Sequence, residues 1–247
     1  MLPVATTNQL LLISNSTQHG RGYLDHAESE IRDFAGKRSG VVFVPFALGD
    51  RRAYTTKVAE RLSTMGLTLT SVHDLSNMAR AVHEAEVIFV GGGNTFRLLT
   101  GLYDHALIGA IRHAVAADAL YIGSSAGSIV AGSTLKTTKD MPIVQPPSFD
   151  ALGLVPFQIS PHYLDPDPTS THMGETQEER ILQYLEENDV PVVGLREGSM
   201  LRVQRGSVRL SGPHGARIFH RGEAPVEARP GADLQDLLQP IAARQFA

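Results

Sequence analysis

A serine between two glycines is the first group in this chain that could do chemistry. Residues 123–127 read Gly-Ser-Ser-Ala-Gly, after a short apolar run and before residues able to open a helix. The pattern G-x-S-x-G in that setting is typical of a nucleophile elbow, a sharp strand-to-helix turn that exposes a serine hydroxyl. The frame selects Ser125, not Ser124, and the glycines would let backbone pack closely around a strained serine. Ser125 is therefore the predicted nucleophile, although a plain glycine–serine turn fits the same residues.

A nucleophilic serine needs a base, and the base needs a carboxylate that orients it. His162 follows an apolar segment at 155–160 that reads as a strand. Reactive groups in open α/β sheets collect beyond the carboxyl ends of strands. Asp140 lies between the serine and the histidine, which gives the chain order Ser, Asp, His of the α/β-hydrolases. The predicted triad is Ser125, Asp140 and His162. The rivals that stay open are the acids Asp150 and Asp165 and the base His172.

A glycine-rich segment at 90–96, Val-Gly-Gly-Gly-Asn-Thr-Phe, stands between a predicted strand and a predicted helix. It lacks the Gly-Lys-Ser/Thr of a P-loop and the spacing G-x-G-x-x-G, so a phosphate cradle is the weaker interpretation. An oxyanion hole suits it better, because a glycine there can direct its N–H at a developing oxyanion. The predicted donors are the amides of Gly93 and of Ala126, the residue after the nucleophile. A tight turn without chemistry remains compatible with the pattern.

The elements that must position these groups alternate between strand and helix up to residue 131. This alternation predicts an α/β fold, with a mostly parallel sheet and helices on both faces. From residue 200 the pattern changes to short strands separated by glycine turns, which predicts a C-terminal antiparallel β segment. We expect a single domain over 1–247. The predicted strands are 10–14, 40–46, 67–72, 86–90, 120–122, 155–160, 191–195, 201–205, 208–211 and 216–220, and the predicted helices are 23–34, 54–65, 77–85, 95–102, 106–117 and 174–188.

Composition narrows the class of protein. A net charge of −4 without a long basic run argues against nucleic acid as the main partner. The absence of cysteine excludes disulfides and a cysteine nucleophile. The apolar segment within residues 1–13 is short and has no basic stretch before it, so it reads as a core strand instead of a signal peptide. No apolar stretch is long enough to span a bilayer. A cytoplasmic protein that binds neither nucleic acid nor membrane is the expectation.

The motifs together resemble peptidase E, the α-aspartyl dipeptidase family of serine peptidases. The resemblance implies a fold related to class I glutamine amidotransferases, a small peptide substrate, no cofactor or metal, and a monomer or homodimer. It also implies Ser125 as nucleophile, Asp140 as acid, His162 as base, and Gly93 and Ala126 as oxyanion donors. The segments that carry the resemblance are 11–17, 23–27, 90–96, 119–123, 125–127, 137–143, 161–162 and 174–176.

Two positions depart from the pattern of that family. Residue 124 is serine where the family carries tryptophan, and Gly174-Glu175-Thr176-Gln177 stands where the family reads Gly-Glu-Thr-Arg. That arginine is implied to bind the aspartyl side chain, and glutamine cannot supply the charge. Arg180 or Arg97 could replace it, and Asn94, Gln177 and Arg180 are the candidate substrate-binding residues. Alternatively, the same triad serves another substrate, as in a cyanophycinase-like peptidase or an esterase. A non-catalytic ligand-binding module is a third hypothesis.

Overall fold

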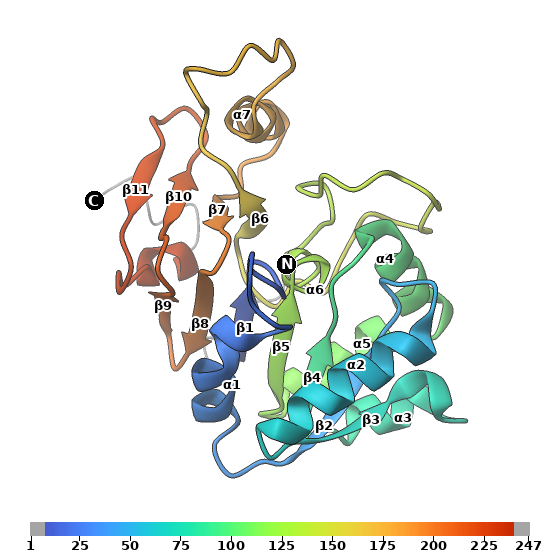
Figure 1. Cartoon of the computed structure of the whole chain (residues 1–247). Coiled ribbons are helices and arrows are strands. Elements are labelled where there is room, and N and C mark those ends of the chain that lie inside the picture. The colour runs from blue at the N-terminus through green and yellow to red at the C-terminus, as the bar shows by residue number, and fades with distance from the viewer. Residues whose placement is uncertain (1–7, 240–247) are drawn as a thin grey trace.

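The computed structural model describes residues 8–239, in which the predicted alternation forms a seven-stranded sheet (Figure 1). Its order is β3-β2-β4-β5-β1-β8-β9, and the first five strands run parallel. Strands β8 and β9 form a hairpin that extends the sheet antiparallel to β1. The bounds are β1 Gln9–Ile13, β2 Gly40–Val44, β3 Thr68–Ser71, β4 Val87–Val90, β5 Leu120–Ser124, β8 Met200–Gln204 and β9 Ser207–Ser211.

Helices cover both faces of this sheet, which confirms the predicted α/β class. Alternate residues of β1 enter different cores: Leu11 and Ile13 pack with α1 and α2, whereas Leu10 and Leu12 pack with α3, α4 and α5. Successive side chains of a strand point to opposite faces, so a strand apolar at every position must be covered on both. The helices are η1 Asp25–Ala27, α1 Glu28–Ala35, α2 Arg51–Thr64, η2 Val72–Asp74, α3 Met78–His83, α4 Thr95–Asp104, α5 Leu107–Ala116, α6 Ala126–Ile129, α7 Gln177–Glu187 and η3 Gln235–Leu238.

A second sheet stands beside the β8–β9 end of the first (Figure 1) and has the order β11-β10-β7-β6. Strands β6 and β7 pair in parallel, and β10 and β11 add antiparallel. Helix α7 packs its apolar side, Ile181 and Leu185, against Tyr163 and Phe219 of this sheet. The bounds are β6 Gln158–Tyr163, β7 Val192–Arg196, β10 Ala216–Phe219 and β11 Val226–Ala228.

The structure corrects several predicted boundaries. The strand predicted at 155–160 runs from 158 to 163, so His162 lies inside β6 instead of after it. Helix α2 begins three residues early, because the Asp50 side chain caps it by accepting from the Ala53 amide at 2.9 Å. The three predicted C-terminal strands all form, but two extend the main sheet and β10 joins the second. Residues 1–7 and 240–247, and with them the ends of the predicted single domain, lie outside the described residues. None of the helices at 8–239 is both apolar and long enough to cross a bilayer.

Candidate active site

Ser125 occupies the predicted elbow, between the end of β5 and the start of α6. Its backbone angles, φ 50° and ψ −107°, are strained for a residue with a side chain. The surrounding glycines make the turn possible: a Cβ on Gly123 would lie 2.6 Å from the Gly127 carbonyl oxygen. The Ser125 amide donates to the Ile13 carbonyl at 3.0 Å, which ties the elbow to the neighbouring strand β1. The strain is thus held in place by packing on both sides of the turn.

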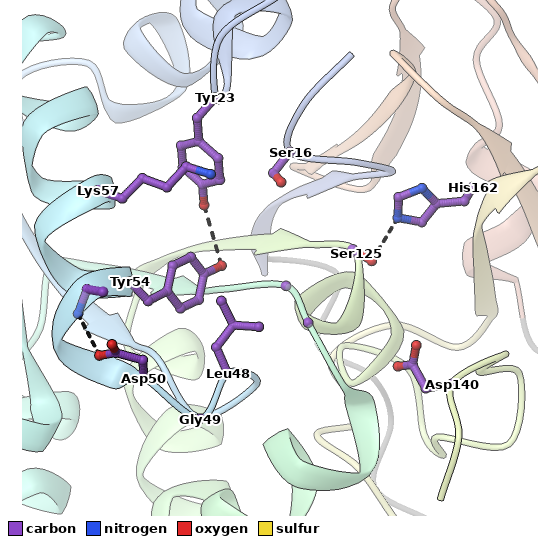
Figure 2. Close-up of a pocket in the computed structure, with 13 residues that line it drawn as sticks. Ser16, Tyr23, Leu48, Gly49, Asp50, Tyr54, Lys57, Ser125, Asp140 and His162 are labelled. Atoms are coloured by element: carbon purple, nitrogen blue, oxygen red, sulfur yellow. Dashed lines mark hydrogen bonds between the residues drawn. The ribbon is translucent and has the colours of Figure 1, made fainter. Parts of the chain in front are cut away.

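His162 meets this serine from the second sheet. Its Nε2 lies 3.0 Å from Ser125 Oγ, and Figure 2 shows the imidazole directed at the hydroxyl. The residue interrupts β6 at a bulge between Pro161 and Tyr163 and has a φ of 51°. A bulge turns a side chain away from the regular alternation of a strand. The irregularity of β6 therefore directs the imidazole out of the second sheet toward the elbow.

The carboxylate that contacts His162 is Glu197. Its Oε1 lies 2.6 Å from Nδ1 of the imidazole, on the side of the ring opposite Ser125. Glu197 directly follows β7, and β7 pairs in parallel with β6, so the two side chains leave adjacent strands at the same edge. Sequence reasoning missed this residue. It could have been predicted, because Glu197 follows the predicted strand 191–195 just as His162 follows the predicted strand 155–160, and reactive groups collect beyond the carboxyl ends of strands.

Asp140, the predicted acid, bonds elsewhere. Its Oδ2 accepts from the Thr95 amide at 2.7 Å and from the Thr95 hydroxyl at 2.6 Å. A carboxylate is stabilised at this position because the first amides of α4 lack helical acceptors and the helix dipole is positive there. Asp140 still lines the same cleft as Ser125, but Figure 2 shows it set apart from the imidazole. The carboxylate that bonds the His162 imidazole is therefore Glu197, whereas Asp140 bonds Thr95.

The rival residues contact other groups. Both carboxylate oxygens of Asp165 accept from the Arg196 guanidinium at 2.8 Å, and this pairing holds the pKa of Asp165 below its usual value. Asp150 forms an isolated β-bridge with Thr134. His172 is exposed in the segment between β6 and α7. None of the three lines the cleft that contains Ser125.

Two polar residues that directly follow β1 bond the backbone at His162 and next to Glu197. Ser14 is fully buried, and its hydroxyl accepts from the His162 amide at 2.9 Å and donates to the Leu195 carbonyl at 2.8 Å. The neighbouring Asn15 accepts from the Gly198 amide at 2.7 Å, beside Glu197. The end of one strand in the main sheet therefore fixes the backbone that carries both the imidazole and its carboxylate.

The glycine segment after β4 forms part of the same cleft. Gly92 and Gly93 line it together with Ser125, and Gly93 has a φ of 136°, which a side chain rarely tolerates. A Cβ on Gly93 would also lie 2.7 Å from the Ala47 carbonyl oxygen. Among the loop and turn hydrogen bonds at 8–239, none uses the amide of Gly93 or Ala126 as donor. Gly93 thus lines the cleft with an amide that no backbone carbonyl within 8–239 accepts from, whereas Ala126, which directly follows Ser125, is fully buried.

Comparison with known proteins decides the family. The sequence profile of peptidase family S51 matches residues 10–211. The chain belongs to peptidase family S51. It is 54% identical to "Peptidase E" of Streptomyces coelicolor over 93% of this chain and 94% of that protein. It is 45% identical to "Probable alpha-aspartyl dipeptidase" of Drosophila melanogaster over 96% of this chain and all of that protein. The resemblance to the peptidase E family that the motifs predicted is thereby confirmed.

Solved structures show the same fold. A putative peptidase E from Listeria monocytogenes covers 90% of this chain and is itself covered to 98%, with a TM-score of 0.58 at 22% identity. A peptidase from an acI-B1 actinobacterium covers 92% and is itself covered to 96%, with a TM-score of 0.67 at 15% identity. At such identities the likeness concerns the fold alone. The overall fold is thus shared with these two structures.

Two of the three substrate-binding candidates of this S51 peptidase, Asn94 and Gln177, are bonded to backbone groups. Asn94 caps α4 by accepting from the Arg97 amide, and its amide nitrogen donates to the Met141 carbonyl. Gln177 donates to the His162 carbonyl at 3.2 Å and accepts from the Leu164 amide at 3.1 Å. Arg180 faces Glu175 and lines a separate small cleft. None of the three side chains is among those that line the cleft around Ser125.

The cleft in front of Ser125 has a volume of about 770 Å³. Its walls come from the segment after β1, from the first two turns of α2, from the glycine segment and from the elbow (Figure 2). Such a volume suits a short peptide. No group of three or more His, Cys, Asp or Glu side chains within 8–239 is arranged to hold a metal ion. The lining residues are Ser16, Tyr23, Leu48, Gly49, Asp50, Ala53, Tyr54, Lys57, Gly92, Gly93, Ser125, Asp140 and His162.

Proposed function

We propose that this protein is a serine exopeptidase that removes an N-terminal aspartyl residue from short peptides. The observation that carries the proposal is the 3.0 Å contact between His162 Nε2 and the hydroxyl of Ser125 on a strained elbow. Nucleophile and base at hydrogen-bond distance, with the base in turn held by a carboxylate, are the signature of serine acyl transfer. The names of the relatives from Streptomyces and Drosophila support the peptidase and aspartyl parts of the assignment.

The geometry supports a reaction in two halves. His162 Nε2 takes the proton of Ser125 while Oγ attacks the first peptide carbonyl, and the Gly93 and Ala126 amides stabilise the oxyanion. The imidazolium then protonates the leaving amine, so that the peptide bond breaks and an acyl-Ser125 ester remains. A water molecule, deprotonated by His162, attacks this ester and releases aspartate with the serine restored. Glu197 holds the imidazole by Nδ1 and stabilises its cation.

The first experiment tests the nucleophile and the substrate class. Wild type and Ser125→Ala are assayed on Asp-Leu and on an aspartyl anilide. The variant is expected to lose at least 1000-fold in kcat, since the members of such a triad act as a unit. Equal rates would remove Ser125 from the mechanism. Failure of the wild type on both substrates would reject the aspartyl assignment.

A matched pair of isosteric variants tests the choice of carboxylate. Glu197→Gln keeps the shape of the partner of His162 but removes its charge, and we expect a kcat at least 100-fold lower. Asp140→Asn does the same at the N-terminus of α4, and we expect a smaller fall in kcat together with a lower melting temperature. The reverse order of the two effects on kcat would return the role to Asp140. Circular dichroism of both variants shows that each is folded.

The glutamine at position 177, where the family has an arginine, leads to an alternative substrate class. Because its amide is bonded to the β6 backbone, it does not take over the task of an arginine. A related hydrolase activity with the same triad, cyanophycinase-like or esterase, is the alternative. A clear preference for neutral or basic X over Asp in X-Leu dipeptides would establish it.

Location and assembly are parts of the same proposal. We infer a cytoplasmic peptidase that acts as a monomer or homodimer, without a nucleic-acid partner. Light scattering on the purified chain would decide between the two states of assembly. Fractionation of cells that produce the protein would test the location, because recovery in the membrane fraction would contradict it.

A further inference from the structure

One helix forms the wall of the cleft that faces away from His162. The residues of α2 and its cap that line the cleft are Asp50, Ala53, Tyr54 and Lys57. Residues three, four and seven apart lie on one side of a helix, so these side chains form a continuous strip. Figure 2 shows Lys57 and Tyr54 at one end of the cleft and Ser125 with His162 at the other. The first two turns of α2 therefore face whatever occupies the cleft.

Lys57 is the single lysine or arginine in the lining described above. Its ammonium lies 4.7 Å from the centre of the Tyr23 ring, an interaction that leaves its hydrogen-bond donors available. Within residues 8–239, no carboxylate lies within ion-pair distance of Lys57: the ion pairs of lysine, arginine and histidine involve other residues. The lysine is exposed, on a flexible stem, and can move toward a ligand.

The other polar side chains on this side of the cleft already form hydrogen bonds within the protein. The Asp50 carboxylate caps α2. The Tyr23 and Tyr54 hydroxyls lie 3.5 Å apart, and burial raises the pKa of both phenols, so they stay neutral. The Tyr23 ring lies beneath the Lys57 ammonium, and Tyr54 lines the cleft next to it. A negative charge entering this end of the cleft would meet the Lys57 ammonium beside two neutral phenols, with the Asp50 carboxylate seven residues away at the start of the same helix.

An N-terminal aspartyl residue carries such a charge on its side chain. We propose that Lys57 binds the β-carboxylate of the substrate's N-terminal aspartate and thereby determines specificity, an inference that rests on the proposed function. The positions that the motifs indicated for this task, Gln177 and Arg180, lie outside the cleft lining. Lys57 supplies the charge from a different element, α2, on the opposite side of the nucleophile. Recognition by a lysine also requires no bidentate geometry, since its ammonium acts as a point charge.

The test compares two substrates of equal shape, Asp-Leu and Asn-Leu, on wild type and Lys57→Met. We expect wild type to prefer Asp-Leu. The variant should lose about 10- to 100-fold in kcat/KM on Asp-Leu, the value of a hydrogen bond to a charged group, and change little on Asn-Leu. Lys57→Arg should keep most of the preference. Arg52→Met, which removes a cation from another side of the same helix, is the matched control and should behave as wild type.

The outcomes separate this inference from the function on which it rests. An Asp-Leu/Asn-Leu ratio unchanged in Lys57→Met, with Asp-Leu still cleaved, would overturn the role of Lys57 and leave the aspartyl dipeptidase intact. Equal losses on both dipeptides, with none on Asp-Leu amide, would instead assign Lys57 to the C-terminal carboxylate of the substrate and refute the inference. A wild type inactive on Asp-Leu would reject both. Melting temperatures close to wild type exclude unfolding as the cause.

Discussion

Replacing Ser14 by alanine removes one oxygen that no substrate touches, yet it should weaken catalysis. The hydroxyl is fully buried at the end of β1 and bonds two backbone groups of the second sheet, the His162 amide and the Leu195 carbonyl. Alanine is smaller by this one oxygen and supplies neither a donor nor an acceptor. The His162 amide and the Leu195 carbonyl would therefore both lose their hydrogen-bond partner.

The size of the effect follows from these two bonds. A buried polar group left without a partner costs about 1–3 kcal/mol. Because Leu195 is fully buried and the Ser14 side chain excludes water from the His162 amide, we expect a loss of about 2–4 kcal/mol in the free energy of unfolding. The His162 backbone would also lose its link to β1, and a displacement of about 1 Å at a catalytic group can cost about 100-fold in rate. A fall of about 10- to 100-fold in kcat/KM is therefore expected.

The assay measures the rate of Ser125 acylation by a fluorophosphonate and kcat/KM on Asp-Leu, beside urea unfolding. Thr137→Val is the matched control, because its buried hydroxyl bonds the Ile159 carbonyl of β6 and does not contact His162. The control should lose stability but stay within about threefold of wild type in acylation, as expected for a site that is not reorganised. If folded Ser14→Ala acylates at the wild-type rate, then β1 does not position the imidazole and the reasoning is refuted.

Three further changes test the packing and the charges around the site. Gly127→Ala places a methyl group against the Val90 carbonyl oxygen, so we expect a loss of activity and a loss of about 1–3 kcal/mol in the free energy of unfolding. Its control is Gly109→Ala in helix α5, where a Cβ would meet nothing within 4 Å and should add about 0.5–1 kcal/mol. Equal unfolding midpoints for the two variants would contradict both expectations. The Ser124 hydroxyl is buried and has no hydrogen-bond partner among the described residues. Ser124→Ala should therefore raise the free energy of unfolding by about 1 kcal/mol. A lower free energy of unfolding in urea would contradict this, because it would mean that the hydroxyl does have a partner. Desolvation by burial lowers the pKa of the Lys139 ammonium to about 8 from 10.5, so between those pH values the unfolded chain binds more protons. Stability should therefore rise with pH across that window relative to Lys139→Met, and parallel pH profiles would refute the assignment.

What the sequence determined by itself is local. Glycines at 123 and 127 predict the elbow because a residue with a side chain cannot pack there. The alternation of strand and helix predicts the parallel sheet, because each helix returns the chain to the end of the sheet at which the next strand begins. His162 was predicted because it follows the apolar segment 155–160, which is recognisable as part of a strand. These patterns depend on the backbone of a few neighbouring residues, which is why Ser125 and His162 could be predicted from composition and spacing.

The tertiary structure decided which partners these residues have. Asp140 and Glu197 are both carboxylates in loops, and spacing along the chain cannot distinguish them. Asp140 bonds Thr95 because a helix N-terminus attracts it, and Glu197 reaches His162 because β7 pairs in parallel with β6. Likewise, Lys57 lines the cleft because α2 forms one of its walls. Gln177 does not line the cleft, and its side chain bonds the backbone of β6 instead. Which carboxylate bonds the imidazole and which bonds the start of α4 depends on how the helices and strands pack together, and spacing along the chain does not contain that information.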